Sequence, residues 1–381
     1  MKFSVSKKDL SETLSIVSGA AAKDKNYPVL QCIYLKASGS SLEMQANNNN
    51  LGIVAKIPCN SEGDGELLLE SKTLIDFVKK FVGDVVTVTT SDKSSDAPIV
   101  KICDSKTSFT MLTLPPDAFP KVNTIEGENS FTMSAKSFKS LVDRTAFAAS
   151  TEETRPIFTG CLFHVSKHSN DSFPTIAYMV ATNTHRIAVD YISDSSASLD
   201  SDLDCIIPAQ QLVELSKRLE DNSIQITPSK KNIAFTFDNL MFVFRLIQGE
   251  YPNHTKVTDK SWSSHMTIDT TDFLNAVQRV ALVAKKTEYS TIKFKIADNE
   301  IEISADCMDG LTAKETISGI DIEGKGIEIA FNVKYILDVL KILDSSKCVM
   351  YFNGGKALEP VKIQSADDDD FIYIVTPVRT N

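Results

Sequence analysis

The most enzyme-like residues in the chain are His185 and Arg186, in the segment VATNTHRIAV. A histidine that acts as a general base needs a nucleophile or a carboxylate beside it, and the local sequence provides neither. The chain has 5 histidines in 381 residues, and no H-x-x-H or H-E-x-x-H motif of the kind that binds zinc. We therefore predict that the chain is not catalytic by itself and that it has no metal site.

Phosphate-binding and redox motifs are also missing from the sequence. No G-x-x-x-x-G-K-[ST], G-x-G-x-x-G or G-x-S-x-G motif occurs, and the pair of glycines in FNGGKAL indicates a turn. The 7 cysteines are scattered and form no C-x-x-C pair, which is typical of a reducing compartment. These patterns predict a cytoplasmic protein that needs no cofactor.

Lysine and arginine gather on segments that we predict to be helical, although the whole chain carries a formal charge of −10. Bases outnumber acids on these segments, so most of the acidic excess must lie on strands and loops. One interpretation is a set of solvated helix faces. The other is a basic helical surface that binds phosphates without reading bases.

The elements that would carry these bases occur three times along the chain. KFSVSKKDL, SFTMSAKSF and HMTIDTTDF each combine a short alternating strand with a helix start, and Ser6, Ser134 and Asp269 stand where an N-cap is expected. The predicted helices place apolar residues at i, i+4, i+7 and i+11, and each pattern ends on an alanine (Ala21, Ala149 and Ala284).

A second predicted helix also recurs in each repeat, and strand-like segments fill the space between the two helices. An acid and a lysine three residues apart recur in this helix (Asp76 and Lys79, Glu214 and Lys217, Asp338 and Lys341). The segments between the helices, such as LGIVAKI, TIAYMVAT and FIYIVT, are rich in β-formers. Aromatic–proline steps at 119–120 and 251–252 indicate linkers. We predict three α+β domains at 1–127, 128–261 and 262–381, with the tract Asp367–Asp370 as a solvated loop.

The order and spacing of several segments along the chain resemble those of a known family over nearly the whole length of the sequence. MKFSVSKKDL with PVLQCIYL, LGIVAKI, VATNTHRIAV, GEYPNHTKV, FNVKYILDVL and the final IVTPVR carry the resemblance. The sequence is similar to the beta subunit of bacterial DNA polymerase III, the replicative sliding clamp. The resemblance implies an α+β fold of three similar clamp domains per chain, each with two helices packed on antiparallel sheets. Two chains would then join head to tail into a six-domain ring around duplex DNA.

The family's peptide pocket lies between its second and third domains, and it binds short peptides of the Gln-x-Leu-x-Phe type. The resemblance places it here at Arg155, Phe158, Thr182, Thr184, His185, Arg186, Ile187, Pro252, Val257, Pro360, Ile374, Val375, Pro377, Val378 and Arg379. Arg186 and Arg379 would frame the entrance. The family usually has Asp-Gly at Asn183-Thr184 and leucine at Ile187, and Thr380-Asn381 extend past its usual end.

The resemblance also implies a DNA path and a dimer interface. The DNA-facing residues would be Lys23, Lys25, Lys79, Lys80, Arg144, Lys217, Arg218, Arg279 and Lys341, and the interface would pair Phe109 and Met111 with Leu282 and Val283. The implied partners are duplex DNA without sequence preference, a second copy of the chain, the polymerase III alpha subunit, the clamp-loader delta subunit and other polymerases and repair proteins with clamp-binding motifs, but no membrane. The alternative, a DNA-modifying enzyme built on repeated α+β domains, lacks any nucleophile, phosphate or metal motif.

Overall fold

The computed structural model describes residues 1–24, 26–90, 99–123, 125, 130–167, 175–194, 197, 199, 201–308 and 310–379. Lys25, the predicted boundary at 127–128 and the last two residues lie outside this part of the chain. The chain divides into two compact units, residues 1–133 with 222–246 and residues 134–221 with 247–381. Among the described residues, no helix is long and apolar enough to cross a membrane.

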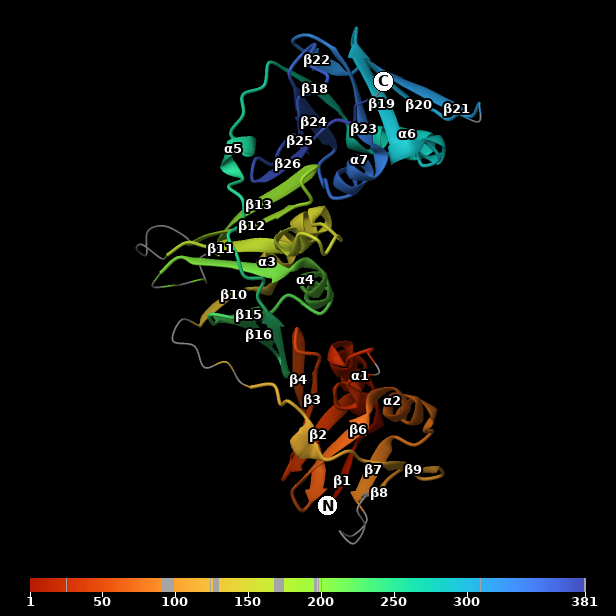
Figure 1. Cartoon of the computed structure of the whole chain (residues 1–381), viewed down its shortest axis with the longest axis vertical. Helices are drawn as coiled ribbons and strands as arrows, with labels where there is room; N and C mark the ends of the chain where they lie inside the picture. Colours follow the sequence, from red (N-terminus) through yellow and green to blue (C-terminus); the bar gives the residue numbers. More distant parts are fainter. Residues whose placement is uncertain are drawn as a thin grey trace. The chain divides into compact units, whose positions relative to one another are not determined.

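The described part of the first unit contains two antiparallel sheets and two α-helices (Figure 1). The smaller sheet has the order β5(Asn60–Glu62), β1(Lys2–Ser6), β7(Val85–Thr90), β8(Ile99–Cys103) and β9(Ser108–Leu112). The larger sheet has the order β10(Phe131–Ser134), β15(Ser223–Pro228), β16(Asn232–Phe237), β17(Leu240–Arg245), β4(Leu51–Pro58), β3(Ser41–Asn47), β2(Cys32–Ser38) and β6(Gly65–Glu70). Helices α1(Lys7–Val17) and α2(Ser71–Lys80) pack against each other.

In its described part, the second unit contains one larger sheet, one smaller sheet and two pairs of packed helices. Its larger sheet has the order β14(Leu203–Pro208), β11(Gly160–Val165), β12(Thr175–Thr182), β13(Arg186–Asp194), β26(Phe371–Val375), β25(Val361–Ser365), β24(Lys347–Phe352), β18(Ser264–Asp269) and β22(Asp321–Glu323). Its smaller sheet has the order β21(Thr312–Ser318), β20(Glu300–Asp306), β19(Thr291–Ala297) and β23(Ile327–Asn332). The helices are α3(Ala135–Thr145), α4(Ala209–Ser216), α5(Thr255–Thr258), α6(Thr270–Ala284) and α7(Val333–Leu340), of which α3 packs on α4 and α6 on α7.

The predicted N-caps are confirmed in all three repeats. The side chains of Ser6, Ser134 and Asp269 each accept a hydrogen bond from the backbone N–H three residues later. Each cap therefore satisfies one of the free donors at the start of its helix. The predicted helix ends are wrong for the first two repeats, because α1 and α3 stop at Val17 and Thr145 and short 3₁₀ turns follow them.

Adjacent repeats join through continuous antiparallel sheets. At the first junction β4 of the first repeat pairs with β17 of the second, and at the second junction β13 pairs with β26 of the third. The buried residues of the first and second predicted helices, such as Leu14, Phe138, Phe273 and Ile336, form the core beneath these sheets. The chain thus has three α+β repeats, as predicted, and the boundaries at 127 and 261 stay a prediction.

Candidate peptide pocket and surrounding sites

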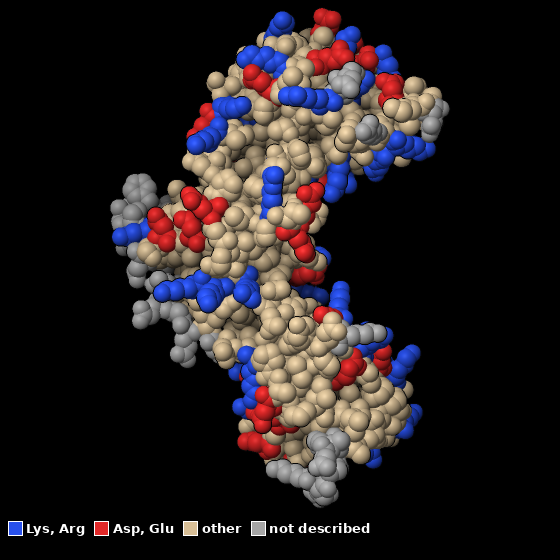
Figure 2. All heavy atoms as spheres, viewed as in Figure 1, with Lys and Arg blue, Asp and Glu red and all other residues tan. Residues whose placement is uncertain are grey.

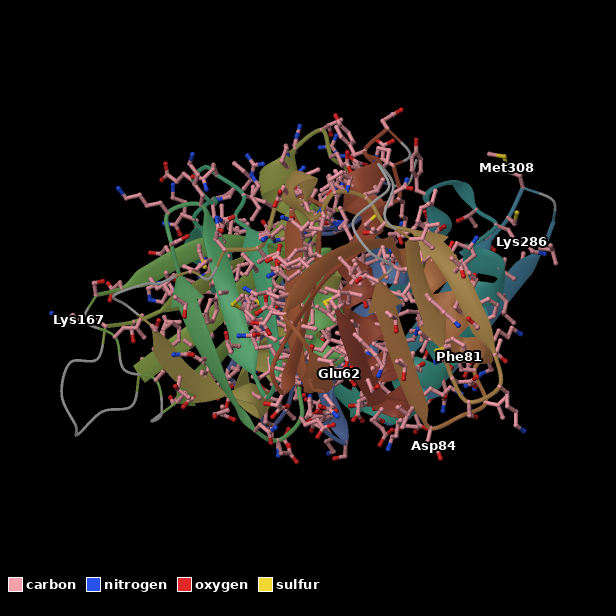
Figure 3. All side chains as sticks on the ribbon, turned by 90° about the horizontal axis from the view of Figure 1, so that it is seen from below. Glu62, Phe81, Asp84, Lys167, Lys286 and Met308 are labelled. Carbon is pink, nitrogen blue, oxygen red and sulfur yellow. The ribbon has the colours of Figure 1, made fainter. Side chains whose placement is uncertain are left out.

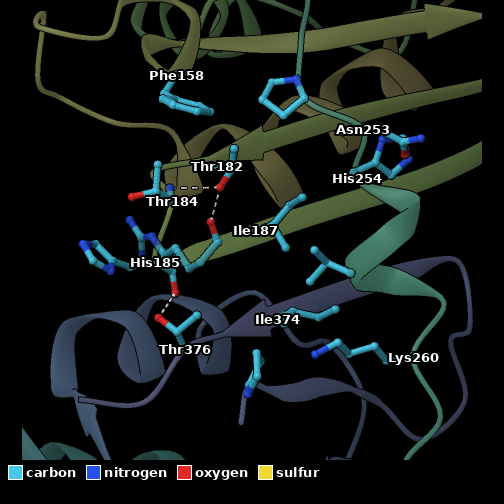
Figure 4. Close-up of a pocket in the computed structure, with 14 residues that line it drawn as sticks. Phe158, Thr182, Thr184, His185, Ile187, Asn253, His254, Lys260, Ile374 and Thr376 are labelled. Carbon is cyan, nitrogen blue, oxygen red and sulfur yellow. Dashed lines mark hydrogen bonds between the residues drawn. The ribbon is translucent and has the colours of Figure 1, made fainter. Parts of the chain in front are cut away.

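A cavity of about 300 Å³ lies at the second junction, within the second unit (Figure 4). The end of β12, the following turn, the start of β13, strand β26 and the linker around α5 form its walls. The residues that line it are Phe158, Thr182, Thr184, His185, Arg186, Ile187, Pro252, Asn253, His254, Val257, Lys260, Pro360, Ile374 and Thr376. Ten of the predicted pocket residues are in this set, so the structure brings most of them together.

The turn between β12 and β13 holds one wall in a fixed shape. The Asn183 side chain accepts hydrogen bonds from the backbone N–H groups of His185 (3.1 Å) and Arg186 (3.0 Å). Thr184 has a φ of 76°, in the left-handed region that a β-branched residue rarely adopts. The glycine that the resemblance leads us to expect at this position would relieve that strain, so Thr184 keeps the turn at some cost in backbone energy. The backbone N–H of Thr376, just after β26, donates a hydrogen bond to the His185 carbonyl at 2.8 Å. This bond connects β26 to the turn.

Arg186 does not frame the entrance as predicted. Its side chain is only 3% exposed, and its guanidinium donates to the carboxylate of Asp338 at 2.7 Å and to the carbonyl of Phe147. The guanidinium also lies over the rings of Phe147 (5.4 Å) and Tyr335 (4.6 Å). Arg186 therefore ties β13 to α7 and supports the pocket from behind. The sequence pattern suggests a pair between Asp338 and Lys341, three residues later. In the structure the Asp338 carboxylate pairs with Arg186.

The linker forms the facing wall, anchored by a buried histidine. His254, at the start of α5, is 8% exposed, and its Nε2 lies 3.4 Å from the hydroxyl of Tyr191. The ring of Tyr178 lies 5.4 Å from the histidine ring. Burial lowers the pKa of His254, although Asp259 opposes the shift, and this direction favours the neutral ring. This packing presents the half-buried side chain of Val257 to the cavity.

Sequence reasoning missed four lining residues, which are Asn253, His254, Lys260 and Thr376. Five predicted residues do not line the cavity, namely Arg155, Val375, Pro377, Val378 and Arg379. Neighbouring residues of a strand point to opposite faces of the sheet. Ile374 faces the cavity, so Val375 points to the other face, where it is fully buried. The backbone N–H of Val378 donates to the Ala330 carbonyl at 2.8 Å, which fixes the tail to β23.

The cavity is suited to apolar side chains beside a few hydrogen-bonding groups. Phe158, Ile187, Val257 and Ile374 supply the apolar surface, and the hydroxyls of Thr182 and Thr376 already donate within the turn (Figure 4). None of the described residues that line the cavity carries a carboxylate, and among them Lys260 is an exposed cation. Such a groove can hold leucine- or phenylalanine-sized anchors of a short peptide.

The predicted DNA-facing bases lie mostly at helix C-termini. Lys79 and Lys80 end α2, whereas Lys217, Arg218 and Lys341 follow directly after α4 and α7. Cations at these positions are also favoured by the helix dipole, so their placement has a structural reason besides DNA. Lys23 lies outside the helix, because the chain leaves α1 at Val17 and a 3₁₀ turn over Ser18–Ala20 comes before it. Figure 2 shows bases and acids interspersed over the face in view.

Two of the predicted DNA-facing arginines are engaged within the chain. Arg279 donates two hydrogen bonds to Glu315. Arg144 is bound by Asp368, lies 3.3 Å from the buried carboxylate of Asp190, and stacks over the Phe371 ring at 4.8 Å. The Asp367–Asp370 tract is therefore not simply solvated, because Asp368 helps to fix α3 to the turn before β26. A phosphate would have to displace these contacts to reach Arg144.

We expect Asp190 to make the stability of this region depend on pH. Burial raises the pKa of its carboxyl to about 7, the carboxylates of Asp368 and Asp370 act in the same direction, and Arg144 opposes them. Because the folded-state pKa lies above the unfolded value, this group's contribution to stability is present below about pH 4 and is lost as the pH rises to about 7.

Replacing the ionisable group should remove this loss. We expect Asp190→Asn to gain stability relative to the parent chain between pH 5 and pH 8, as measured by urea unfolding at both values. Asp221→Asn, at an exposed position of the same unit, is the matched control. A stability difference between Asp190→Asn and the parent that is the same at both pH values would contradict this interpretation.

Two of the predicted interface residues lie on the first unit's smaller sheet, and the other two lie on helix α6, which packs on the second unit's smaller sheet. Phe109 and Met111 are half-buried on the edge strand β9, and the Phe109 ring stacks on Phe77 at 4.1 Å. In the other unit Leu282 is 71% exposed on α6, next to the half-buried Val283. The Cys307 thiol donates to the Lys286 carbonyl just after α6, and the adjacent Met308 is 97% exposed and projects away from the ribbon (Figure 3). Each unit thus exposes apolar side chains close to an unpaired sheet edge, as surfaces that join chains often do.

The repeated α+β architecture and the junction cavity are typical of three-domain clamp proteins. Comparison with known proteins then identifies the family. Models of the N-terminal, central and C-terminal domains of the DNA polymerase III beta subunit match residues 1–123, 132–253 and 256–379. The chain belongs to the DNA polymerase III beta subunit family, the bacterial sliding clamps.

Individual relatives agree over the full length. The chain is 27% identical to the beta sliding clamp of Staphylococcus aureus, over 97% of this chain and 96% of that protein. It superposes on the crystal structure of the DNA polymerase sliding clamp from Bacillus subtilis with a TM-score of 0.92 and 27% identity, over all of both chains. A putative DNA polymerase III beta subunit from Eubacterium rectale gives a TM-score of 0.89 and 27% identity, over 99% of each chain.

Proposed function

We propose that two copies of the chain close head to tail into a ring that encircles duplex DNA and tethers the replicative polymerase. The junction cavity carries this proposal, because it is a preformed apolar groove on a fold that belongs to the sliding-clamp family. The ring would keep the polymerase on its template by topology and not by tight DNA contacts. The chain would thereby act as the non-catalytic accessory subunit of a DNA-directed DNA polymerase in the cytoplasm.

The exposed edges support ring closure. Strand β9 is an edge of the first unit's smaller sheet, and β21 is an edge of the second unit's smaller sheet. Pairing of β9 in one copy with β21 in the other would satisfy both rows of free backbone groups. The apolar residues Phe109, Met111 and Leu282 would then be covered in the same contact.

The junction cavity would receive the partners. We propose that the polymerase alpha subunit, the clamp-loader delta subunit and repair polymerases each insert a short peptide with leucine- or phenylalanine-sized anchors. Ile187, Val257 and Ile374 would contact these anchors. Among the described residues, no group of three His, Cys, Asp or Glu side chains stands close enough to hold a metal ion, so no observation favours the alternative of a metal-dependent DNA-modifying enzyme.

The DNA path can be tested with charge reversal. We expect Lys79→Glu, Lys217→Glu and Lys341→Glu together to weaken DNA binding at low salt and to lower the salt slope by about 3, since each lost phosphate contact removes about 1. All three side chains are exposed, so the chain should still fold. The melting temperature should fall only slightly, because each helix loses a favourable dipole interaction of about 0.3–1 kcal/mol.

The matched control reverses three exposed lysines on strands, Lys36, Lys101 and Lys295. It changes the net charge equally but leaves the helix ends intact. Fluorescence anisotropy with a labelled duplex measures both variants across a salt series. Equal weakening by the two triple variants would show a general charge effect and would remove the helix C-termini from the proposed DNA path.

A further inference from the structure

The turn that builds the peptide pocket at the second junction is repeated at the first junction. In the turns 48–51 and 183–186, the backbone N–H of the first residue donates to the backbone carbonyl of the fourth residue. The donor–acceptor distances are 3.0 Å in the first turn and 3.3 Å in the second. The second residue of each turn has a positive φ, 71° at Asn49 and 76° at Thr184. The first residue is asparagine in both, and its side chain accepts from the third and fourth N–H groups. The two turns are therefore the same structure.

The surrounding strands and linker are repeated as well. Arg245, at the end of β17, donates its backbone N–H to the Asn50 carbonyl at 2.9 Å. Thr376, after β26, does the same to the His185 carbonyl at 2.8 Å. The residues after each aromatic–proline step then cross the junction and line a cavity. The chain thus builds one pocket scaffold twice, once in each unit.

The first-junction cavity measures about 220 Å³ and lies wholly within the first unit. Its lining is Asn47, Asn49, Asn50, Leu51, Gly52, Lys121, Val122, Asn123, Ile125, Asn232, Val243 and Arg245. Five of these are asparagines, and the two charged residues are both cations. The scaffold is shared with the second junction, but carboxamides and positive charge replace most of the apolar surface.

A single position explains part of this difference. Gly52 begins the pairing of β4 with β3 at the place where Ile187 stands in β13. A Cβ on Gly52 would lie 2.8 Å from the Val122 side chain, so the linker occupies the space that an apolar wall would need. The first-junction cavity therefore has no counterpart of the isoleucine that we assign to peptide anchors.

Arg245 is the cation that remains available in this cavity. It is exposed, and it forms no ion pair with any residue that the structure describes. Lys121, in contrast, lies 2.9 Å from the Glu66 carboxylate and 4.8 Å from the centre of the Tyr34 ring. The positive charge of Lys121 is thus already balanced, and an incoming anion would meet the Arg245 guanidinium.

We propose that the first-junction cavity binds an extended peptide segment that carries an aspartate or a glutamate. The guanidinium of Arg245 can pair with the carboxylate through two parallel hydrogen bonds. The Asn47 side chain is engaged within the chain, since it donates to the Pro120 carbonyl and accepts from the Asn49 N–H, both at 2.8 Å. The carboxamides of the other four lining asparagines each carry a donor and an acceptor that match the N–H and C=O groups of a peptide backbone. This inference rests on the proposed peptide binding at the second junction, since it assigns the same task to the same scaffold with altered chemistry.

The test uses the full-length chain and two labelled octapeptides. One is Gly-Ser-Asp-Val-Asp-Ser-Gly-Ser, and the other has asparagine in place of both aspartates. Fluorescence anisotropy gives the affinities, and hydrogen exchange followed by mass spectrometry locates the site. We expect the acidic peptide to protect residues 47–52 and to bind at least about 10-fold tighter than its asparagine counterpart. Arg245→Glu should lose at least the same factor, and Lys101→Glu, an exposed base on β8, should lose none.

Three results would overturn the proposal. They are no protection at 47–52, an affinity that Arg245→Glu leaves unchanged, and equal protection by inorganic phosphate alone, which would show an anion site and not a peptide site. A Gln-x-Leu-x-Phe-type peptide in the same experiment reports on residues 182–187. If this peptide does not protect residues 182–187, the peptide pocket of the proposed function is rejected. That outcome is independent of the protection measured at residues 47–52.

Discussion

Met111→Asp combined with Leu282→Asp is expected to give folded monomers that no longer stay on circular DNA. In the proposed head-to-tail ring the two side chains would face each other across the closed interface, and burying unpaired carboxylates there would cost several kcal/mol each. In the single chain Leu282 is 71% exposed and Met111 is half-buried on an edge strand, so the fold of each chain should survive. Native mass measurement should give one chain of 41.9 kDa in place of two.

The control places the same charges on exposed apolar residues elsewhere. Tyr27→Asp with Leu358→Asp changes side chains that are 58% and 64% exposed and that belong to neither predicted interface surface. This variant should remain a dimer. A Met111–Leu282 double variant that still measured as a dimer, with unchanged circular dichroism, would place the interface on another surface.

Val257→Asp is expected to abolish binding of partner peptides. Val257 lines the cavity from α5, and an anchor that packs on it would have to bury an uncompensated carboxylate. Loss of a leucine-sized contact alone is worth about 1.5–3 kcal/mol, or roughly 10- to 150-fold in affinity, and the buried charge adds to this. Isothermal titration with a Gln-x-Leu-x-Phe-type peptide should therefore show a loss of at least about 100-fold.

Lys256→Asp is the matched control, because Lys256 lies on the same short helix but is exposed and does not line the cavity. It should keep the parent affinity, and both variants should stay dimeric. If Val257→Asp bound the peptide at full strength while its fold was intact, the anchors would lie outside this cavity. Equal loss in both variants would indicate a distorted α5 and not a lost contact.

The sequence was sufficient for features that depend on local patterns. The N-caps Ser6, Ser134 and Asp269 and the buried helix faces follow from side-chain type and spacing, and the structure confirms them. Ile187 and Ile374 could be assigned to one pocket by resemblance, and they face each other directly in the paired strands β13 and β26.

Features that depend on long-range packing were not predictable in this way. His254 lines the pocket because its ring packs under Tyr178 and Tyr191, which lie on strands far away in the sequence. Arg186 was predicted at the rim, but Asp338, 152 residues further on, draws its guanidinium into the interior. No local spacing in the sequence indicates either contact.

Retention on DNA tests the central claim most directly. The protein is loaded with its clamp loader onto a nicked circular plasmid, and gel filtration at high salt separates bound from free protein. A ring held by topology should stay with the circle, since salt weakens phosphate contacts but does not open the ring, and it should leave when a restriction enzyme linearises the plasmid. Loss from the circle at high salt, or equal retention on circular and linear DNA, would contradict the proposal that this chain is a sliding clamp.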